Sequence, residues 1–92
     1  MLLEWDERKR LANIVKHRLD FADAVFILDS EKVLRLPARP AGDEVRHRAI
    51  GLVRGIPVAV IYTERGDAIR VISMRRARDD ERQLLDQTLH GR

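Results

Sequence analysis

The sequence predicts one small α+β domain spanning residues 1–92: an antiparallel meander sheet of four to five strands, with two helices before it and one after it. Residues 58–62 form an apolar run rich in β-branched and aromatic side chains, which is typical of a strand. Gly66, which adopts positive φ at no steric cost, then allows a hairpin into a return strand over residues 69–74. Apolar residues at helical spacing occur near the two ends of the chain. We therefore expect the order β-α-α-β-β-β-β-α, with the helices on one face of the sheet.

The first elements are a short strand and two helices. Residues 2–5 are expected to form the strand, and Asp6 to cap a helix that ends near residue 17 or 18. Asp20 is expected to cap a second helix over residues 21–28. The apolar residues at helical spacing predict the buried stripes of the two helices: Leu11, Ile14, Val15 and Leu19 in the first, and Phe21, Ala24, Val25 and Leu28 in the second.

Two more strands and a helix complete the expected fold. Residues 32–36 alternate weakly and predict a strand, which the proline- and glycine-containing loop 37–43 ends. Residues 44–53 predict a stronger strand that turns at residues 54–55 into the hairpin. Asp79 or Asp80 is expected to cap the last helix, with Arg82 and Asp86 spaced for an ion pair. The inward side of this helix is expected to consist of Leu84, Leu85, Thr88 and Leu89.

Composition excludes several classes of protein. The chain has no cysteine, so it has neither a disulfide framework nor a thiolate zinc site. Its longest apolar run is far shorter than the roughly 20 residues of a membrane span. The start lacks the basic and apolar regions of a signal peptide, so we expect a cytoplasmic protein. The isolated histidines and scattered carboxylates predict no metal site, and no cofactor is expected.

The basic charge is concentrated in the second half of the chain. Residues 1–44 hold eight basic and nine acidic side chains, whereas residues 45–92 hold ten basic and six acidic ones. Fifteen of the eighteen basic residues are arginine, whose rigid guanidinium fork matches phosphate geometry. The bias points to RNA, DNA or an acidic protein surface as the partner, with ordinary surface salt pairs as the alternative.

The chain resembles the BrnT toxins, the toxin halves of bacterial type II toxin–antitoxin pairs. The resemblance covers nearly the whole chain and rests on Trp5-Asp6, Asn13, Lys16-His17, Phe21, Ala24, Phe26, Asp29, Glu44, Arg46, Gly51, Tyr62-Thr63-Glu64, Gly66, Arg70, Ile72-Ser73, Arg75, Ala77 and Glu81-Arg82. Three residues depart from the family pattern. Arg18 replaces a usual glycine, Met74 a usual alanine, and Leu85 a common tyrosine.

The resemblance implies a RelE-like fold and a metal-independent ribonuclease that blocks translation. It also implies a BrnA-like antitoxin carrying a ribbon-helix-helix domain, so that operator DNA is contacted only through the antitoxin. Arg18 is expected to change only the turn between the first two helices. Met74 and Leu85, expected near the active face, bear on the degree of activity rather than on the fold.

RNA cleavage without a metal needs a base, an acid and fixed positive charge around the phosphorane. For charge stabilisation we predict Arg46, Arg70 and Arg75, which lie on or at the ends of neighbouring strands. The alternative is that they form surface ion pairs with Glu44, Glu64 or Asp67. A regular strand would send Arg70 and Arg75 to opposite faces. Either a bulge near Ser73 redirects one of them, or only one belongs to the site.

His17 and Glu44 are the leading candidates for proton transfer. His17 could instead complement the helix dipole, and Glu44 could instead hold Arg46 or Lys16 by a charge pair. Phosphate contacts are expected from four further side chains: Lys16, Arg48, Ser73 and Arg76.

Two other functions remain open at this stage. The same arginines would serve a non-enzymatic module that binds nucleic acid or an antitoxin, and a catalytically inactive relative would keep the fold and the partner. The ribonuclease interpretation requires the guanidinium groups to converge in one concave patch.

Overall fold

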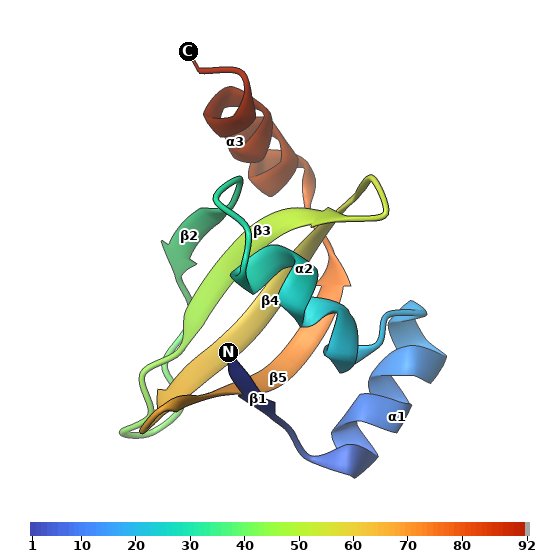
Figure 1. The fold of residues 1–92 in the computed structure, drawn as a ribbon, viewed down its shortest axis with the longest axis vertical. Coiled ribbons are helices and arrows are strands. Elements are labelled where there is room, and N and C mark those ends of the chain that lie inside the picture. Colours follow the sequence, from blue (N-terminus) through green and yellow to red (C-terminus); the bar gives the residue numbers. More distant parts are fainter. Residues whose placement is uncertain (92) are drawn as a thin grey trace.

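A five-stranded sheet with helices on both faces forms the centre of the protein (Figure 1), as a computed structural model describes it for residues 1–91. The elements in chain order are β1 (Leu2–Glu4), α1 (Glu7–His17), the 3-10 turn η1 (Phe21–Ala24), α2 (Val25–Leu28), β2 (Leu34–Pro37), β3 (His47–Val53), β4 (Ile56–Arg65), β5 (Ala68–Arg76) and α3 (Asp79–Leu89). No helix within residues 1–91 is long and apolar enough to cross a membrane.

The strands lie in the order β1-β5-β4-β3-β2. β2 to β5 form the expected antiparallel meander, but β1 pairs in parallel with β5, so the sheet is mixed and the prediction of a wholly antiparallel sheet is wrong. No turn joins β1 to β5, and nothing local in the sequence therefore specifies their pairing. The helix order also differs from the predicted one, because residues 21–28 form η1 and the single-turn α2 rather than one helix.

Both faces of the sheet are covered, which corrects the expectation of helices on one face. Along β4, Val58 and Val60 belong to the core that contains Ile27 of α2, whereas Ala59 packs in a second cluster with Leu85 of α3. Successive residues of a strand point to opposite faces, so α2 and α3 lie on opposite sides of the sheet. The continuous apolar run in β4 is the pattern of a strand buried on both faces.

The hairpins and the N-caps at Asp6 and Asp20 are confirmed. Gly66 has φ 58° in the β4–β5 turn, and Arg54 and Gly55 have φ 49° and 79° in the β3–β4 turn. Asp6 accepts hydrogen bonds from two amides of the first turn of α1, and Asp20 accepts one from the Ala22 amide at 2.9 Å.

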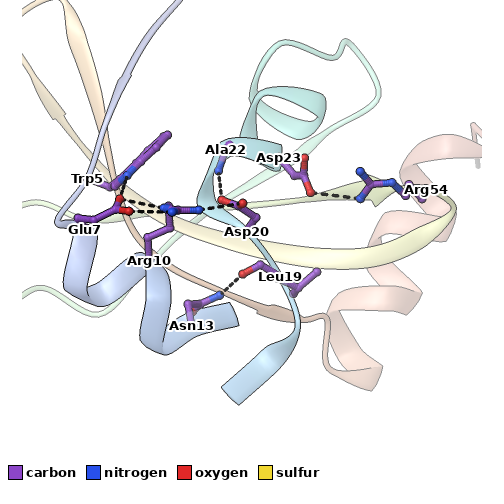
Figure 2. A network of polar contacts seen from close by, with 9 residues as sticks. All are labelled: Trp5, Glu7, Arg10, Asn13, Leu19, Asp20, Ala22, Asp23 and Arg54. Carbon is purple, nitrogen blue, oxygen red and sulfur yellow. Dashed lines mark hydrogen bonds and ion pairs between the residues drawn. The ribbon is translucent and has the colours of Figure 1, made fainter. Parts of the chain in front are cut away.

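A polar network fixes the passage from α1 to η1 (Figure 2). The Arg10 guanidinium bridges Glu7, with O···N distances of 2.7 and 2.8 Å, and Asp20 at 3.0 Å. Arg18 ends α1 at φ 58°, a left-handed conformation that favours glycine and explains why glycine suits this position.

The predicted apolar stripe of α1 is wrong for Leu11 and Val15, whereas Leu19 is buried in the core and Ile14 is partly buried. Leu11 and Val15 are 51% and 80% exposed, and the buried side chain of the helix is Asn13. The Asn13 side chain donates to the Leu19 carbonyl at 3.0 Å and accepts from the Met74 amide at 3.2 Å. β1 pairs only with the start of β5, so α1 lies beside the remaining free edge of that strand (Figure 1). A strand edge presents backbone amides, and it therefore needs a polar side chain opposite it.

The start of α3 differs from the prediction. Arg78 is the N-cap, while Asp79 and Asp80 are the first two helical residues. The Arg82 guanidinium pairs with Asp79 at 2.6 Å rather than with Asp86, which instead pairs with His90. Of the four residues expected to face inward, Leu85 is buried and Leu89 partly buried, whereas Leu84 and Thr88 are exposed. α3 packs chiefly against β3 and β2, so a narrow apolar stripe suffices.

Candidate active site

A β-bulge in β5 places Arg70 and Arg75 on the same face of the sheet. Arg70 lies opposite Thr63 of β4 and Arg75 opposite Ala59, and directly opposed residues share a face. Positions 59 and 63 are four apart in β4, so both arginines point to the α3 side. Val71 and Ser73 lie opposite the consecutive β4 residues Tyr62 and Ile61, so Ile72 between them is an extra residue without a partner. This extra residue puts Arg70 and Arg75 on the same face although they are five positions apart. Of the two alternatives left open for Arg70 and Arg75, the bulge near Ser73 is thus present.

Five arginines line one hollow of about 450 Å³ on the α3 side of the sheet. We call it the arginine pocket; the rest of its lining is Pro37, Ala38 and Ile61, and its arginines are Arg39, Arg46, Arg48, Arg75 and Arg78. Two of the three predicted charge-stabilising residues, Arg46 and Arg75, therefore meet here, together with the predicted phosphate ligand Arg48. Arg70 shares the face but does not line the pocket, and its Nη1 lies 3.6 Å from the Glu4 carboxylate.

Glu81 is a buried carboxylate that holds two of these arginines side by side. Arg75 donates to it through both terminal nitrogens, at 2.7 and 3.0 Å, and Arg48 donates at 2.8 Å. The Arg78 amide donates a fourth hydrogen bond at 2.8 Å, so the same carboxylate also stabilises the start of α3. The residue is fully buried.

Burial opposes ionisation of the Glu81 carboxyl, but the hydrogen bonds from Arg75, from the Arg78 amide and from Arg48 outweigh it and lower its pKa from 4.5 to about 2. In turn, the hydrogen bonds to Glu81 raise the pKa of Arg75. Both partners are therefore charged at neutral pH. Sequence reasoning gave Glu81 no site role, because an acidic residue in the first turn of a helix is ordinary dipole chemistry.

Glu44 lies outside the arginine pocket and lines a neighbouring hollow with His47 and Glu64. Its carboxylate accepts a hydrogen bond from Arg46 Nε at 2.8 Å. Of the two alternatives left open for Glu44 as a partner, the structure shows the pair with Arg46 and not one with Lys16. Ser73 pairs opposite Ile61 and therefore shares the face of Arg75. It lines neither the arginine pocket nor the hollow at the C-terminal end of α1.

Another hollow, of about 480 Å³ and separate from the one beside Glu44, lies at the C-terminal end of α1. All its lining side chains are basic or histidine, and we call it the α1 pocket: Lys16, His17, Arg18, Arg75, Arg76 and Arg78. Apart from Arg75, none of these side chains forms an ion pair with any carboxylate in residues 1–91. Arg75 and Arg78 line both pockets, so the two hollows adjoin.

Six of the nine predicted site residues thus fall into two adjoining groups rather than one patch, and Arg70, Glu44 and Ser73 lie outside both. Lys16, His17 and Arg76 meet Arg75 in the α1 pocket, while Arg46 and Arg48 meet it in the arginine pocket. Sequence reasoning missed Arg39, Arg78 and the role of Arg18, which sit in loops and at helix ends. Only their charge could have signalled them.

Two of the three departures from the family pattern, Met74 and Leu85, are buried core residues. Met74 is fully buried in the cluster on the α2 side and lines neither pocket, so its side chain does not lie on the sheet face that carries the arginine pocket. Leu85 is buried in the cluster under α3 and lines neither pocket. Within residues 1–91, no three histidine, aspartate or glutamate side chains are grouped so that they could hold a metal ion.

Paired guanidinium groups beside an imidazole can bind a phosphodiester and stabilise charge that develops on it. The family described as "Ribonuclease toxin, BrnT, of type II toxin-antitoxin system" matches residues 5–81, which include every residue of both pockets and Glu81. No curated protein matches the chain. The match confirms the resemblance seen in the sequence, and its extent shows that this chain belongs to the BrnT family of ribonuclease toxins of type II toxin–antitoxin systems.

Proposed function

We propose that this toxin cleaves RNA at the junction of the two basic pockets, by attack of a 2′-hydroxyl on the adjacent phosphorus and without a metal ion. The observation that carries the proposal is that Arg75 and Arg78 line both pockets. A phosphodiester bound between them has His17 on one side and Arg48 on the other. Arginine forks are well suited to grip two phosphate oxygens at once.

The proposed reaction is a transesterification. A base takes the 2′-hydroxyl proton, the 2′-oxygen bonds to phosphorus, and the P–O5′ bond breaks as the leaving oxygen receives a proton. The products are a 2′,3′-cyclic phosphate and a free 5′-hydroxyl. Arg75 neutralises the charge that builds on the phosphorane, and Glu81 fixes its orientation in advance. Preorganised charge of this kind performs the task that a metal ion has in other nucleases.

His17 is the proposed proton-transfer group. Its half-buried ring lies in the α1 pocket with Arg75, and imidazoles as a class exchange protons near neutral pH. Glu44 is the less suitable candidate because its carboxylate is outside both pockets and holds Arg46. Lys16, Arg48 and Arg76 contact the phosphates, as the sequence predicts. Arg70 and Ser73 share the binding face and contact the RNA strand beyond the two pockets.

Family membership supports the remaining parts of the proposal. Type II toxins act with an antitoxin, and we infer a BrnA-like partner with a ribbon-helix-helix domain through which the pair binds its operator DNA. We also infer a RelE-like fold, in which residues 1–92 act as one domain, and arrest of translation in the cytoplasm through mRNA cleavage. The meander preceded and followed by helices agrees with such a fold.

Cleavage by purified toxin in the presence of EDTA tests this proposal. We expect RNA fragments that end in 2′,3′-cyclic phosphate and 5′-hydroxyl groups, from free RNA or from mRNA in a translation extract. His17→Gln should lower the rate by about 10²–10⁴-fold. Arg75→Lys keeps the charge but loses the fork, and it should lower the rate by about 10²–10³-fold.

Two matched variants serve as controls. His90→Gln removes an exposed histidine at the end of α3, and Arg54→Lys alters an exposed arginine in the β3–β4 turn. Both lie outside the pockets and should cleave like the unchanged toxin. RNA that stays intact while still binding would favour a non-enzymatic binding module. Cleavage that appears only with divalent ions would contradict the metal-free reaction.

A further inference from the structure

The arginine pocket is larger and more varied than one phosphate requires. Besides Arg75 and Arg78, which it shares with the α1 pocket, it has Arg39, Arg46 and Arg48. Within residues 1–91, only two carboxylates, Glu44 and Glu81, pair with these arginines. The pocket therefore keeps a surplus of positive charge after its internal ion pairs are counted.

Arg39 adds a specific observation. It lies on the exposed loop between β2 and β3, and its side chain makes no ion pair or side-chain hydrogen bond with other residues of the range 1–91. It lines the arginine pocket and not the α1 pocket. An unpaired guanidinium that lines this pocket but not the α1 pocket is free to bind a second phosphate.

The rest of the lining is apolar. Ile61 of β4 is partly exposed at the floor, and Pro37 and Ala38 form one wall where β2 ends. Neither the floor nor this wall offers a charged group, so both suit the face of a base or a ribose rather than a phosphate. Unstacked bases of single-stranded RNA are commonly held against apolar or guanidinium planes in this way.

We infer that the arginine pocket is a subsite for the nucleotide next to the scissile phosphate, with its base over Ile61 and its outer phosphate on Arg39 and Arg46. This inference rests on the proposed function, which places the scissile phosphate at Arg75 and Arg78. Its consequence is a substrate requirement. Single-stranded RNA with two consecutive phosphodiesters binds much better than a dinucleotide with one.

Binding of non-cleavable oligonucleotides tests the subsite separately from catalysis. Dinucleotide and trinucleotide 2′-fluoro RNAs with unphosphorylated ends are used to displace a labelled longer RNA from the toxin. We expect the trinucleotide to bind at least about tenfold better, since a charge-assisted contact contributes on the order of one such factor. The salt dependence of trinucleotide binding should show a slope of about −1.4, which corresponds to two neutralised phosphates.

Arg39→Gln is the diagnostic variant because Arg39 has no structural partner to lose. In this variant the gain from dinucleotide to trinucleotide should fall below about threefold, and the salt slope should flatten by about 0.7. Arg54→Gln, outside both pockets, is the matched control and should retain the full gain.

Equal binding of the two oligonucleotides, or a full gain in Arg39→Gln, would overturn the subsite. Such a result leaves the proposed function intact if the toxin still cleaves RNA in EDTA. Conversely, a toxin that shows the full trinucleotide gain but never cleaves RNA keeps the subsite and refutes the ribonuclease reaction at its junction.

Discussion

Replacement of Glu81 by glutamine tests whether one buried carboxylate organises the site. Glutamine has nearly the same shape, but it carries no charge and presents an NH2 group where the carboxylate has an acceptor oxygen. In the structure Glu81 accepts from Arg75 twice, from Arg48 once and from the Arg78 amide once. The glutamine side chain can accept only part of these four hydrogen bonds. Its NH2 group then faces a guanidinium N–H group, so two donors oppose each other.

The pKa of Glu81 sets the scale of the loss. A fall from 4.5 to about 2 corresponds to roughly 3 kcal/mol in favour of the ionised form in the folded protein. The loss of one partner from a buried charged network typically costs about 3–5 kcal/mol. Because Arg48 and Arg75 remain about a fifth exposed to water, we expect a loss at or just below the lower limit of this range, about 2–3 kcal/mol. For a domain of this size the midpoint of thermal unfolding should fall by roughly 10–20 °C.

The expected effect also depends on pH. The folded pKa of Glu81 is lower than the unfolded one, so its contribution is complete above about pH 5 and is lost as the pH falls towards 2. The difference in unfolding free energy between the unchanged protein and Glu81→Gln should therefore shrink over this range. Urea unfolding at several pH values measures it.

Asp79→Asn is the matched control on the same helix. Asp79 pairs with Arg82 at 2.6 Å, a shorter distance than any in the Glu81 network, but its side chain is 88% exposed. Exposed pairs contribute little, so this variant should lose less than about 1 kcal/mol. If Glu81→Gln were as mild as Asp79→Asn, or if the difference persisted unchanged at pH 2, burial would not be the source of the stabilisation.

Two further substitutions test how the helices are attached to the sheet. Asn13→Ala removes the acceptor of the Met74 amide, so the free energy of unfolding in urea should fall by about 2–3 kcal/mol and hydrogen exchange at that amide should become faster. Leu11→Ala, on the exposed side of α1, is the control and should cost almost nothing. Gly51→Ala would place a methyl group 3.0 Å from Ile27 Cγ2 and 3.1 Å from Ile27 Cγ1, so we expect a loss of about 1–3 kcal/mol by thermal unfolding. Ile27→Ala removes both γ carbons, so the loss in the double variant should be smaller than the sum of the two single losses, and additive losses would contradict the steric reason.

Sequence reasoning succeeded where the structure depends on near neighbours. The caps at Asp6 and Asp20 and the glycine turn at Gly66 need only a few residues to specify them, and all three are confirmed. It failed for Leu11 and Val15, whose helical spacing predicts a buried stripe. The spacing is correct for a helix, but the surface that α1 meets is a strand edge and not an apolar sheet face.

The candidate site divides in the same manner. The arginines of β3 and β5 could be predicted as site residues from the sequence, because charged side chains on central strands are unusual. Their separation into two pockets depends on α1 and on the β2–β3 loop, which come from distant parts of the chain. Glu81 was unpredictable as a site residue, since only the tertiary fold reveals that the first turn of α3 faces Arg48 and Arg75.

The bulge at Ile72 shows how packing requirements determine which face the arginines share. With Arg75 fixed opposite Ala59, a regular β5 would turn Arg70 to the α2 side and Ile69 to the α3 side. The extra residue reverses this, so that Ile69 packs against the α2 core and Arg70 remains on the face of Arg75. Register follows the apolar pattern wherever one face is buried, and here two apolar residues in succession leave room for one to be unpaired. The common face of the arginines is therefore a consequence of where β5 buries its apolar side chains, and the proposed RNA binding would make use of it.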